Sequence, residues 1–499
     1  MTERLMQRAL LATIIAVVSL SCSPNRETEF FTGRVDFPVQ PNLGVKEAMA
    51  ARVVPHQRQL EWQKLEMTAF IHFTINTFTD MEWGTGKESP ELFNPSSLDA
   101  DQWVRVLSGA GMKMVIITAK HHDGFCLWPT KTTSHSVASS PWKEGKGDVI
   151  RELKDACDRH NMKFGIYLSP WDRNAACYGD SPAYNRFYME QLTELLTWYG
   201  KVDEVWFDGA NGEGPDGRRQ EYDWQAYYDL IRKLQPDAVT AIMGEDVRWV
   251  GTESGYGRET EWSATVLAPG GTPESVAINE ALGIDAMSDD LGSSSLLSRA
   301  EHLFWYPAEV DVSIRPGWFW HASEDSLVKD VEKLADIYLS SVGRNAVLLL
   351  NVPPDNRGLI TDHDIKSLQG LKAWIDDLYS TDMLNGARPY GQGASNLIDG
   401  DNSTSWSPHR KRVASFVPAI AATFNTAMLQ EDISRGQRVE KFVIEALSGE
   451  RWDTIARGTT IGYRRLLRFP EVKADEIRLT IVSSRATPHI STFALYNAR

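Results

Sequence analysis

Short runs of β-forming residues alternate with amphipathic helical stretches through most of this sequence, and this alternation constrains the fold more than any other feature. The runs that indicate strands cover residues 68–73, 112–118, 163–168, 203–207, 238–243, 311–315 and 346–350. The helical stretches between them include residues 149–157, 184–199 and 326–342. Such alternation is typical of parallel strands joined by helices, in either a closed barrel or an open doubly wound sheet.

The open sheet is disfavoured because a motif is missing. A glycine-rich phosphate loop would be expected after an early strand of a doubly wound fold, and the sequence has none there. We therefore predict a (β/α)8 barrel over residues 58–380, with a Gly/Ser-rich insertion at about 264–298. From about residue 381 the helical periodicity stops and short apolar runs are separated by Gly, Asn and Pro. This change predicts a C-terminal all-β sandwich over residues 381–499.

The N-terminus has the layout of an export signal. Two arginines precede an uncharged apolar run over residues 9–20, which is too short to span a bilayer. The run ends in Ser19-Leu20-Ser21-Cys22, which resembles the lipobox of bacterial lipoproteins, whose cysteine is lipidated. We expect a signal peptide over residues 1–22, lipidation of Cys22, a polar tether over residues 23–57, and a location in the bacterial periplasm or at the cell surface. An ordinary cleaved signal with an incidental cysteine is the alternative.

Charge and cysteine usage exclude several partners. The formal net charge is -15 and no Lys/Arg-rich run occurs, so the sequence lacks an electrostatic footprint for nucleic acid or anionic lipid. A membrane partner is expected only through the N-terminal lipid anchor. Cys126, Cys157 and Cys177 lack metal-ligand spacing, so we predict no cofactor and no catalytic metal. A structural calcium in the C-terminal module is left open.

The residues that follow the predicted strands are the candidates for chemistry, because active sites of barrel enzymes lie at the carboxyl ends of the strands. These residues are His72, Lys120 to Asp123, Tyr167, Trp171, Asp208, Glu245, Asp246 and Arg315 to His321. Imidazoles, a phenol, indoles and a carboxylate without a phosphate clamp indicate a pocket for a neutral polyol such as a sugar. Adjacent strand residues point to opposite faces, so we interpret His121 and His122 as hydrogen-bond donors and not as a metal pair.

A sugar pocket with carboxylates predicts glycoside hydrolysis. The retaining route needs one ionised carboxylate to attack the anomeric carbon and one protonated carboxyl to donate to the leaving oxygen, about 5–5.5 Å away. Asp208 fits the nucleophile, because it follows a strand between Phe207 and Gly209. An Asp that caps the next helix is the alternative. For the acid, the residues leave four candidates open, namely Glu245, Glu253, Glu259 and Glu261.

Six motifs between residues 62 and 358 resemble the α-L-fucosidases of glycoside hydrolase family 29. They are Phe70-Ile-His-Phe73, Glu82-Trp83-Gly84, Ala119-Lys-His-His-Asp-Gly-Phe-Cys-Leu-Trp128, Gly165-Ile-Tyr-Leu-Ser-Pro-Trp171, Val205-Trp-Phe-Asp-Gly-Ala210 and Leu349-Leu-Asn-Val-Pro-Pro354. The resemblance implies a barrel enzyme that releases L-fucose from a fucosylated oligosaccharide or glycoconjugate. It also implies that Asp208 is the nucleophile and forms a covalent fucosyl-enzyme.

The resemblance further implies which residues bind the sugar. The positions that match hydroxyl-binding residues of the family are His72, His121, His122 and Tyr167. The loop after the first strand contributes Glu82 and Trp83, with Glu88 as a rival. The expected aromatic walls are Trp318 and Trp320 beside the methyl group of fucose, and Trp249 and Trp262 beside the acid.

The run Asp246-Val-Arg-Trp-Val-Gly-Thr-Glu253 is similar to the Arg-Trp-x-Gly-Asn-Glu signature of the branch that removes α-1,3- and α-1,4-linked fucose. This similarity implies Glu253 as the acid/base, with Thr252 in place of the usual Asn, and leaves Glu261 as the fallback. The implied substrates are Lewis-type glycans. A fucosidase of α-1,2 or α-1,6 linkage, or a surface lipoprotein that binds glycans without cleaving them, is the alternative.

One motif falls in the C-terminal part. Leu397-Ile-Asp-Gly-Asp-Asn-Ser-Thr-Ser-Trp406 resembles the opening of discoidin-like, galactose-binding modules. The resemblance leaves open whether this domain binds sugar or only supports the barrel.

Overall fold

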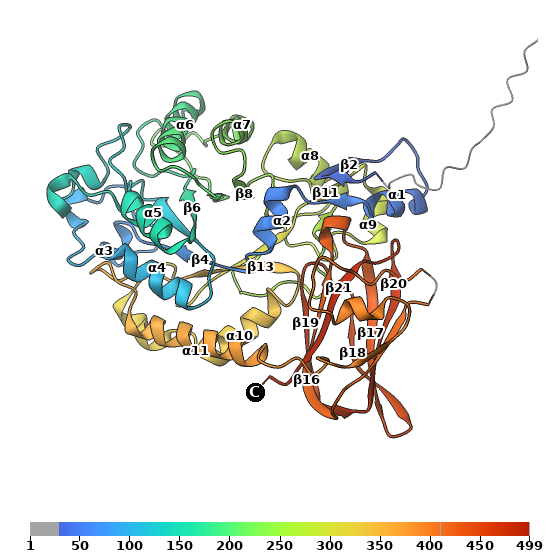
Figure 1. The fold of residues 1–499 in the computed structure, drawn as a ribbon. Helices are drawn as coiled ribbons and strands as arrows, with labels where there is room; N and C mark the ends of the chain where they lie inside the picture. The colour runs from blue at the N-terminus through green and yellow to red at the C-terminus, as the bar shows by residue number, and fades with distance from the viewer. Residues whose placement is uncertain (1–28, 410, 499) are drawn as a thin grey trace, which may run out of the picture.

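The computed structural model describes residues 29–409 and 411–498, and its largest sheet is the predicted barrel (Figure 1). Eight strands follow the order β8-β7-β6-β5-β4-β13-β12-β9, and all of their pairings are parallel. Their bounds are β4 (Met67–Ile71), β5 (Met114–Lys120), β6 (Lys163–Leu168), β7 (Glu204–Phe207), β8 (Val239–Ile242), β9 (Arg248–Trp249), β12 (Ala308–Ser313) and β13 (Ala346–Asn351). A parallel bridge between Ala241 and Val247 links β8 to the residue before β9 and closes the ring.

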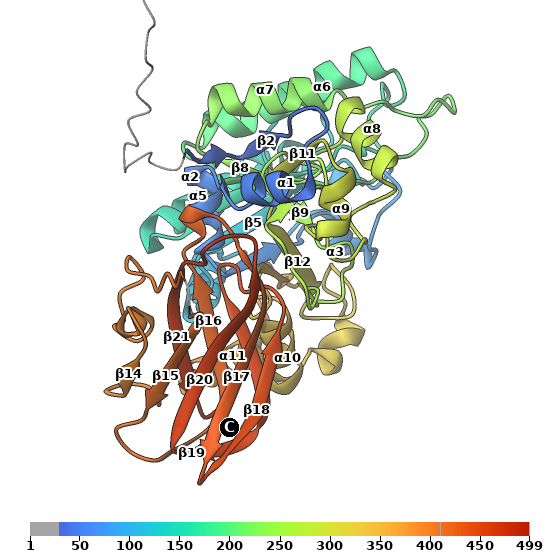
Figure 2. The ribbon, with the colours of Figure 1, turned by 90° about the vertical axis from the view of Figure 1, so that its right-hand side faces the viewer.

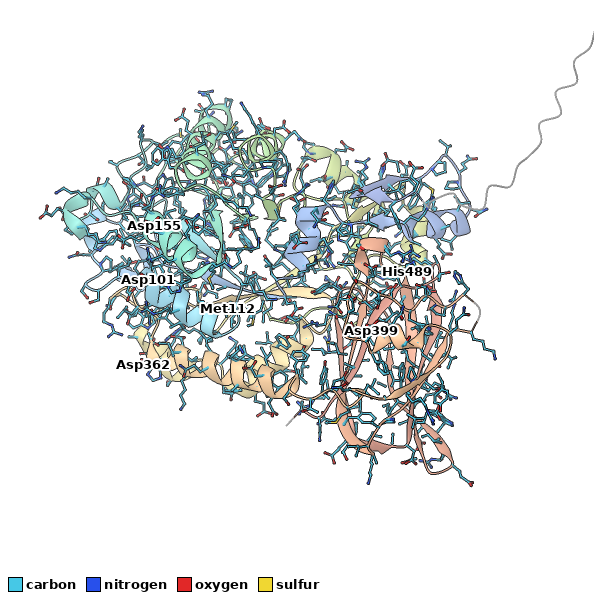
Figure 3. The ribbon with its side chains drawn as sticks, viewed as in Figure 1. Asp101, Met112, Asp155, Asp362, Asp399 and His489 are labelled. Carbon is cyan, nitrogen blue, oxygen red and sulfur yellow. The ribbon has the colours of Figure 1, made fainter. Side chains whose placement is uncertain are left out.

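Helices cover the outside of the barrel, and five of them begin in the same way. The residues Asp99, Asp148, Asp180, Asp223 and Asp330 are the N-caps of α4 (Ala100–Gly109), α5 (Val149–His160), α6 (Ser181–Trp198), α7 (Trp224–Leu234) and α10 (Val331–Ser340). Each carboxylate accepts a backbone N–H of the first turn that has no partner within the helix. Together with α11 (Asp362–Leu378), these helices form the outer layer, which Asp101 of α4, Asp155 of α5 and Asp362 of α11 mark in Figure 3.

The barrel interior is filled by side chains, as its closure requires. Phe70, Ile116, Trp206 and Leu349 belong to one buried cluster there, and Trp62 from α2 (Gln57–Gln63) joins it. The indole of Trp62 donates to Oε2 of the fully buried Glu204 at 2.8 Å. The packed interior leaves a rigid frame whose strand ends can fix side chains in place.

The polar tether that we expected over residues 23–57 does not describe residues 31–54, which are folded. β1 (Phe31–Thr32) pairs with β3 (Val53–Val54), β2 (Arg34–Asp36) pairs with β11 (His302–Trp305), and α1 (Leu43–Ala50) lies between β2 and β3. Val35, Ala50 and Val53 are buried in one cluster with Trp305. Backbone pairing and these few apolar side chains fasten the segment to the barrel. The predicted signal peptide and Cys22 lie outside the described residues.

The insertion at 264–298 contains regular structure. It forms β10 (Ala264–Thr265), which pairs with β11, and α8 (Pro273–Leu282), and it leads into α9 (Ser294–Arg299). Thr272 caps the N-terminus of α8 with its hydroxyl, and Gly283 ends the helix with φ at 67°, a left-handed conformation that suits glycine. The insertion therefore carries a well-defined helix beside the barrel.

The C-terminal strands form the predicted sandwich (Figure 2). One sheet has the order β14-β15-β20-β17-β18 and the other β19-β16-β21, with antiparallel pairs throughout. The bounds are β14 (Arg388–Tyr390), β15 (Val413–Val417), β16 (Ala422–Glu431), β17 (Val439–Ser448), β18 (Arg451–Gly458), β19 (Arg465–Ala474), β20 (Glu476–Ser484) and β21 (Ile490–Tyr496). Trp406, Phe416, Phe442 and Phe493 fill its core. Figure 3 marks this domain with Asp399 and His489.

Within residues 29–409 and 411–498, no helix is both long enough and apolar enough to cross a bilayer.

Candidate active site

Asp208 lies directly after β7, at the carboxyl end of the barrel, with its side chain 25% exposed. Its Oδ2 accepts a 2.9 Å hydrogen bond from Tyr167 Oη, and its Oδ1 accepts one of 2.7 Å from the backbone N–H of Ala210. His122 Nε2 is 3.8 Å from Oδ2. The next helix, α7, is capped by Asp223, so Asp208 is not a helix cap. Both carboxylate oxygens are thus held in one orientation, as a nucleophile requires.

Three imidazoles stand beside this carboxylate. His72 follows β4, and His121 and His122 follow β5. The ring centroids of His121 and His122 are 4.1 Å apart, and those of His72 and His121 are 5.5 Å apart. Our expectation that the adjacent histidines point to opposite faces is wrong, because β5 ends at Lys120 and both imidazoles lie beyond the strand pleat.

Burial determines the charge of these histidines. It lowers the pKa of His72 to about 3, against a hydrogen bond of 2.9 Å between His72 Nδ1 and Asn351 Oδ1. Burial also lowers the pKa of His121 and His122, with Asp208 opposing the effect at His122. All three are therefore neutral near pH 7, and a neutral imidazole both donates and accepts. Such rings suit the hydroxyl groups of a sugar.

The structure brings no metal cluster to this imidazole group. Within the part of the chain that the structure describes, no group of three or more His, Cys, Asp or Glu side chains has an arrangement that could hold a metal ion. Lys120, the last residue of β5, forms a buried ion pair with Asp172 at 2.9 Å.

Aromatic side chains border the imidazoles. The ring centroids of Trp318 and His72 are 5.1 Å apart, and Trp83 contacts His122 edge-on with a centroid distance of 6.0 Å. Phe319 belongs to the candidate run Arg315 to His321 but was not among the expected aromatic walls, and it packs edge-on against His72 at 5.4 Å and His121 at 5.1 Å. The exposed indole of Trp83 can stack on the apolar face of a ring.

Glu82 holds this aromatic loop in place. Its carboxylate accepts the backbone N–H groups of Trp318 at 2.9 Å and Phe319 at 3.1 Å, and it also contacts His321 Nε2 at 2.7 Å. Three partners at once occupy most of the acceptor capacity of this carboxylate. Glu82 is therefore placed to support the backbone of Trp318 and Phe319.

Three predicted sugar-binding residues have other partners. Glu88 closes its own turn by accepting the N–H of Gly86 at 2.9 Å, and Trp320 donates to Asp325 at 3.2 Å. Trp262 is buried, donates to Asp290 at 2.8 Å and lies under the Arg485 guanidinium at 3.7 Å. The sequence motif could not reveal the contact between Trp262 and Arg485, because Arg485 lies more than 200 residues further along the chain. Trp262 is therefore corrected from a sugar wall to a buried contact with the sandwich.

One of the four candidate acids shares a cavity with Asp208. The cavity measures about 620 Å³ and is lined by Asp208, Trp249 and Glu253, among others. Glu253 is exposed, and its Oε2 accepts the indole N–H of Trp318 at 3.3 Å.

The other three acids are occupied elsewhere. Glu261 is buried in an ion pair with Arg248, and Glu259 pairs with Arg344 at 2.5 Å and with Arg465 at 2.7 Å. Glu245 lies 4.0 Å from Arg232, outside this cavity. The fallback Glu261 is therefore corrected to a structural ion-pair partner.

A further carboxyl, Asp311, lines the same cavity and was missed by the sequence reasoning. It lies on β12, is 3% exposed, and accepts the indole N–H of Trp249 at 2.8 Å. Burial raises its pKa to about 7, with nearby Glu253 and Asp208 adding to the effect. The available signal was the alternation Glu309-Val-Asp311-Val-Ser313, which puts three polar residues on the interior face of one strand.

The insertion also lines the cavity. Leu267, Ala268, Val276, Ile284 and Ala286 contribute apolar surface, and Asn279, Glu280 and Asp285 add polar groups. The cavity thus combines candidate catalytic carboxyls with apolar surface, as in many sites that bind a small molecule.

Comparisons with known proteins identify the family of the chain. The family model described as Alpha-L-fucosidase matches residues 46–378. The chain is 41% identical to alpha-L-fucosidase 1 of Arabidopsis thaliana, over 89% of this chain and 87% of that protein. A Bacteroides ovatus protein of solved structure, assigned as an α-L-fucosidase, is 55% identical with a TM-score of 0.89 and covers 95% of this chain and 79% of its own. A Ruminococcus gnavus GH29 fucosidase solved in complex with fucose is 31% identical with a TM-score of 0.79, over 90% of this chain and 95% of that one.

Proposed function

We propose, because the chain belongs to the α-L-fucosidase family of glycoside hydrolases, that it removes terminal α-1,3- or α-1,4-linked L-fucose from Lewis-type glycans with retention of configuration. Asp208 is the nucleophile and Glu253 the acid/base. The observation that carries this proposal is the shared cavity, in which an oriented carboxylate and an exposed carboxyl on a separate loop face the same space.

The first step forms a covalent intermediate. An Oδ of Asp208 attacks C1 of fucose as the bond between C1 and the leaving oxygen breaks, and Glu253 transfers its proton to that oxygen. The products are a fucosyl ester of Asp208 and the free alcohol of the remaining glycan. Glu253 is left as a carboxylate.

The second step reverses the roles. Glu253 takes a proton from water while the water oxygen attacks C1, and the ester bond to Asp208 breaks. Fucose leaves, Asp208 is a carboxylate again and Glu253 again holds a proton. Two inversions at C1 give net retention.

The fucose ring is held by the residues around Asp208. His72, His121 and His122 are neutral, and they exchange hydrogen bonds with the sugar hydroxyls without burying a charge. Trp318 and Trp83 supply the stacking surfaces. A pocket of this kind selects an uncharged deoxy sugar.

The linkage is supported by the run that ends in Glu253 and by the cavity wall. The run resembles the α-1,3/1,4 branch of the family, and apolar side chains of the insertion line the same cavity as Glu253, where the remaining glycan would contact them. We also interpret the sandwich as a discoidin-like module, from the motif at residues 397–406.

Free fucose release and active-site labelling test the function. We expect release from a Lewis trisaccharide and little from α-1,2- or α-1,6-linked substrates; the reverse order would move the chain to another linkage class.

A 2-fluoro-fucosyl donor should label Asp208, and Asp208→Ala should lose nearly all activity. A label on another residue, or a first-formed product of inverted configuration by NMR, would overturn the mechanism.

The location is also a proposal, namely export with lipid anchoring at Cys22. It is supported by the signal layout and the lipobox-like run at residues 19–22. Expressed in a bacterium, the wild-type chain should fractionate with membranes, and Cys22→Ala should move it to the soluble fraction. If the Cys22→Ala variant fractionated in the same way as the wild-type chain, the location would not depend on a lipid anchor at Cys22.

A further inference from the structure

The loop that carries Glu253 has little support at that residue itself, and its nearest backbone contacts with the barrel are from Val250 to Glu309 and from Gly257 to Ser340. We call residues 250–263, between β9 and β10, the acid loop. Glu253 and its neighbours Thr252 and Ser254 are exposed, and among the residues that the structure describes the Glu253 carboxylate has one contact within hydrogen-bond distance, to Trp318. A general acid must stay within hydrogen-bond reach of the leaving oxygen, so a loop of this kind needs an anchor elsewhere.

The two ends of the acid loop are tied to each other. Arg248, just before the loop, and Glu261, near its end, form an ion pair whose side chains are 1% and 2% exposed. The Arg248 guanidinium also donates to the carbonyl of Trp262 at 3.3 Å. The pair closes the loop at its base and thereby limits the conformations available to Glu253.

The base of the loop is seated on the sandwich. Gln437, just before β17, accepts the N–H of Ser263 at 2.7 Å with Oε1 and donates from Nε2 to the carbonyl of Glu261 at 3.0 Å. Thr460 accepts the N–H of Glu261 at 3.0 Å with its hydroxyl. Gln437 and Thr460 are 0% and 1% exposed. If either side chain were removed, water could not readily take its place as the partner of these backbone groups.

Other sandwich residues extend this contact on both sides. Arg465 donates to the carbonyl of Glu259 at 2.8 Å, and the Arg485 guanidinium covers the Trp262 ring. In Figures 1 and 2 the sandwich lies beneath the layer of β2, β11 and α1, against the side of the barrel. The two domains therefore meet where the acid loop ends.

We propose that the C-terminal sandwich is a positioning element of the active site, in which Gln437 and Thr460 seat the base of the acid loop and so hold Glu253 in place. The inference rests on the proposed function. Neither residue lines the cavity; both act through the Glu261 to Ser263 backbone and the Arg248 pair.

The seat acts on the acid and not on the nucleophile. Asp208 follows β7 and is held by Tyr167 and the N–H of Ala210, both within the barrel. A loosened acid loop should therefore slow proton donation to the leaving oxygen while leaving attack on C1 intact. Proton donation matters most for a poor leaving group, so substrates of two kinds separate the effects.

The experiment compares Gln437→Met and Thr460→Val with the wild type on two substrates. One is the oligosaccharide that the wild type cleaves fastest, and the other is an aryl fucoside with a good leaving group. We expect kcat/KM, which reports only the first step, to fall about tenfold on the oligosaccharide and less than about threefold on the aryl fucoside. Gln430→Met, at another buried glutamine of the sandwich, is the matched control and should change neither.

Two outcomes would overturn the proposal: an equal loss on both substrates, or no loss on the oligosaccharide. Thermal unfolding is followed for each variant; if Gln437→Met does not fold, Thr460→Val, which removes only a hydroxyl, decides. Glu253→Gln is run on the same substrates. If that variant shows no dependence on the leaving group, the assignment of the acid in the proposed function fails, which is a different result from failure of the seat.

Discussion

The hydroxyl of Tyr167 donates a 2.9 Å hydrogen bond to Oδ2 of Asp208 from the neighbouring barrel strand. In the parallel register of β6 and β7, Tyr167 pairs with Trp206, so its ring reaches the carboxylate that follows two residues later. Burial and the nearby Asp208 carboxylate raise the pKa of Tyr167, which keeps the phenol protonated as a donor. The register of two strands thus orients the proposed nucleophile.

Removal of this donor should slow the first step. For Tyr167→Phe we expect kcat/KM on an aryl fucoside to fall about 10- to 100-fold, because a hydrogen bond to a charged group contributes about 1.5–3 kcal/mol. Tyr227→Phe is the control, since its hydroxyl binds Asn185 at 2.6 Å away from Asp208. Equal effects of the two variants would show that the contact does not orient Asp208.

Loss of the Glu261 carboxylate should destabilise the fold. Glu261→Gln leaves Arg248 buried without its anion, and breaking a buried pair costs about 3–5 kcal/mol in the free energy of unfolding. Denaturant unfolding measures this value. Glu274→Gln, whose carboxylate is 74% exposed and faces the 42% exposed Arg34, should cost less than about 1 kcal/mol. If Glu261→Gln were as stable as the wild type yet inactive, Glu261 would be the acid.

The buried Asp311 should make stability depend on pH. Its pKa is raised from 3.8 to about 7 in the folded protein, so the native state keeps a proton that the unfolded chain releases above pH 4. This contribution to the free energy of unfolding falls as the pH rises from about 4 to 7. Asp311→Asn removes it, so the stability of the variant relative to the wild type should rise by roughly 2 kcal/mol between pH 5 and pH 8. Urea unfolding at the two pH values decides; a difference that does not vary with pH would contradict the expectation.

The apolar wall of the cavity should matter only for extended substrates. Val276 on α8 lines the cavity and is 45% exposed. For Val276→Ser we expect KM for the oligosaccharide to rise about three- to tenfold, since apolar contact with the remaining glycan is lost, while KM for an aryl fucoside stays unchanged. Val482→Ser, at a half-exposed position of the sandwich, is the control. An equal rise for both substrates would place Val276 beside fucose itself.

The sequence predicted the barrel and the sandwich because both follow from local patterning. Alternating strands and helices require parallel pairing, and the residues after each strand then converge at one rim. His72, His121, His122, Tyr167 and Asp208 do gather there. The folded segment 31–54 was not predicted, in part because β11, the pairing partner of β2, lies about 270 residues later in the chain.

Other side chains were decided by tertiary contacts alone. Four glutamates were equivalent on composition, and only the path of the acid loop puts Glu253 in the cavity and buries Glu261 against Arg248. Asp311 was overlooked because a polar residue within a strand reveals its direction only once the barrel closes.

The sequence by itself therefore determined seven of the eight barrel strands, all but β9, and the nucleophile candidate at the end of one of them. It could do so because a strand and the residue after it are fixed by neighbours in the chain. The tertiary structure decided which carboxyl faces Asp208, since that choice depends on a loop whose base is held by Gln437 and Thr460. Contacts between residues almost 200 positions apart leave no periodicity in the sequence.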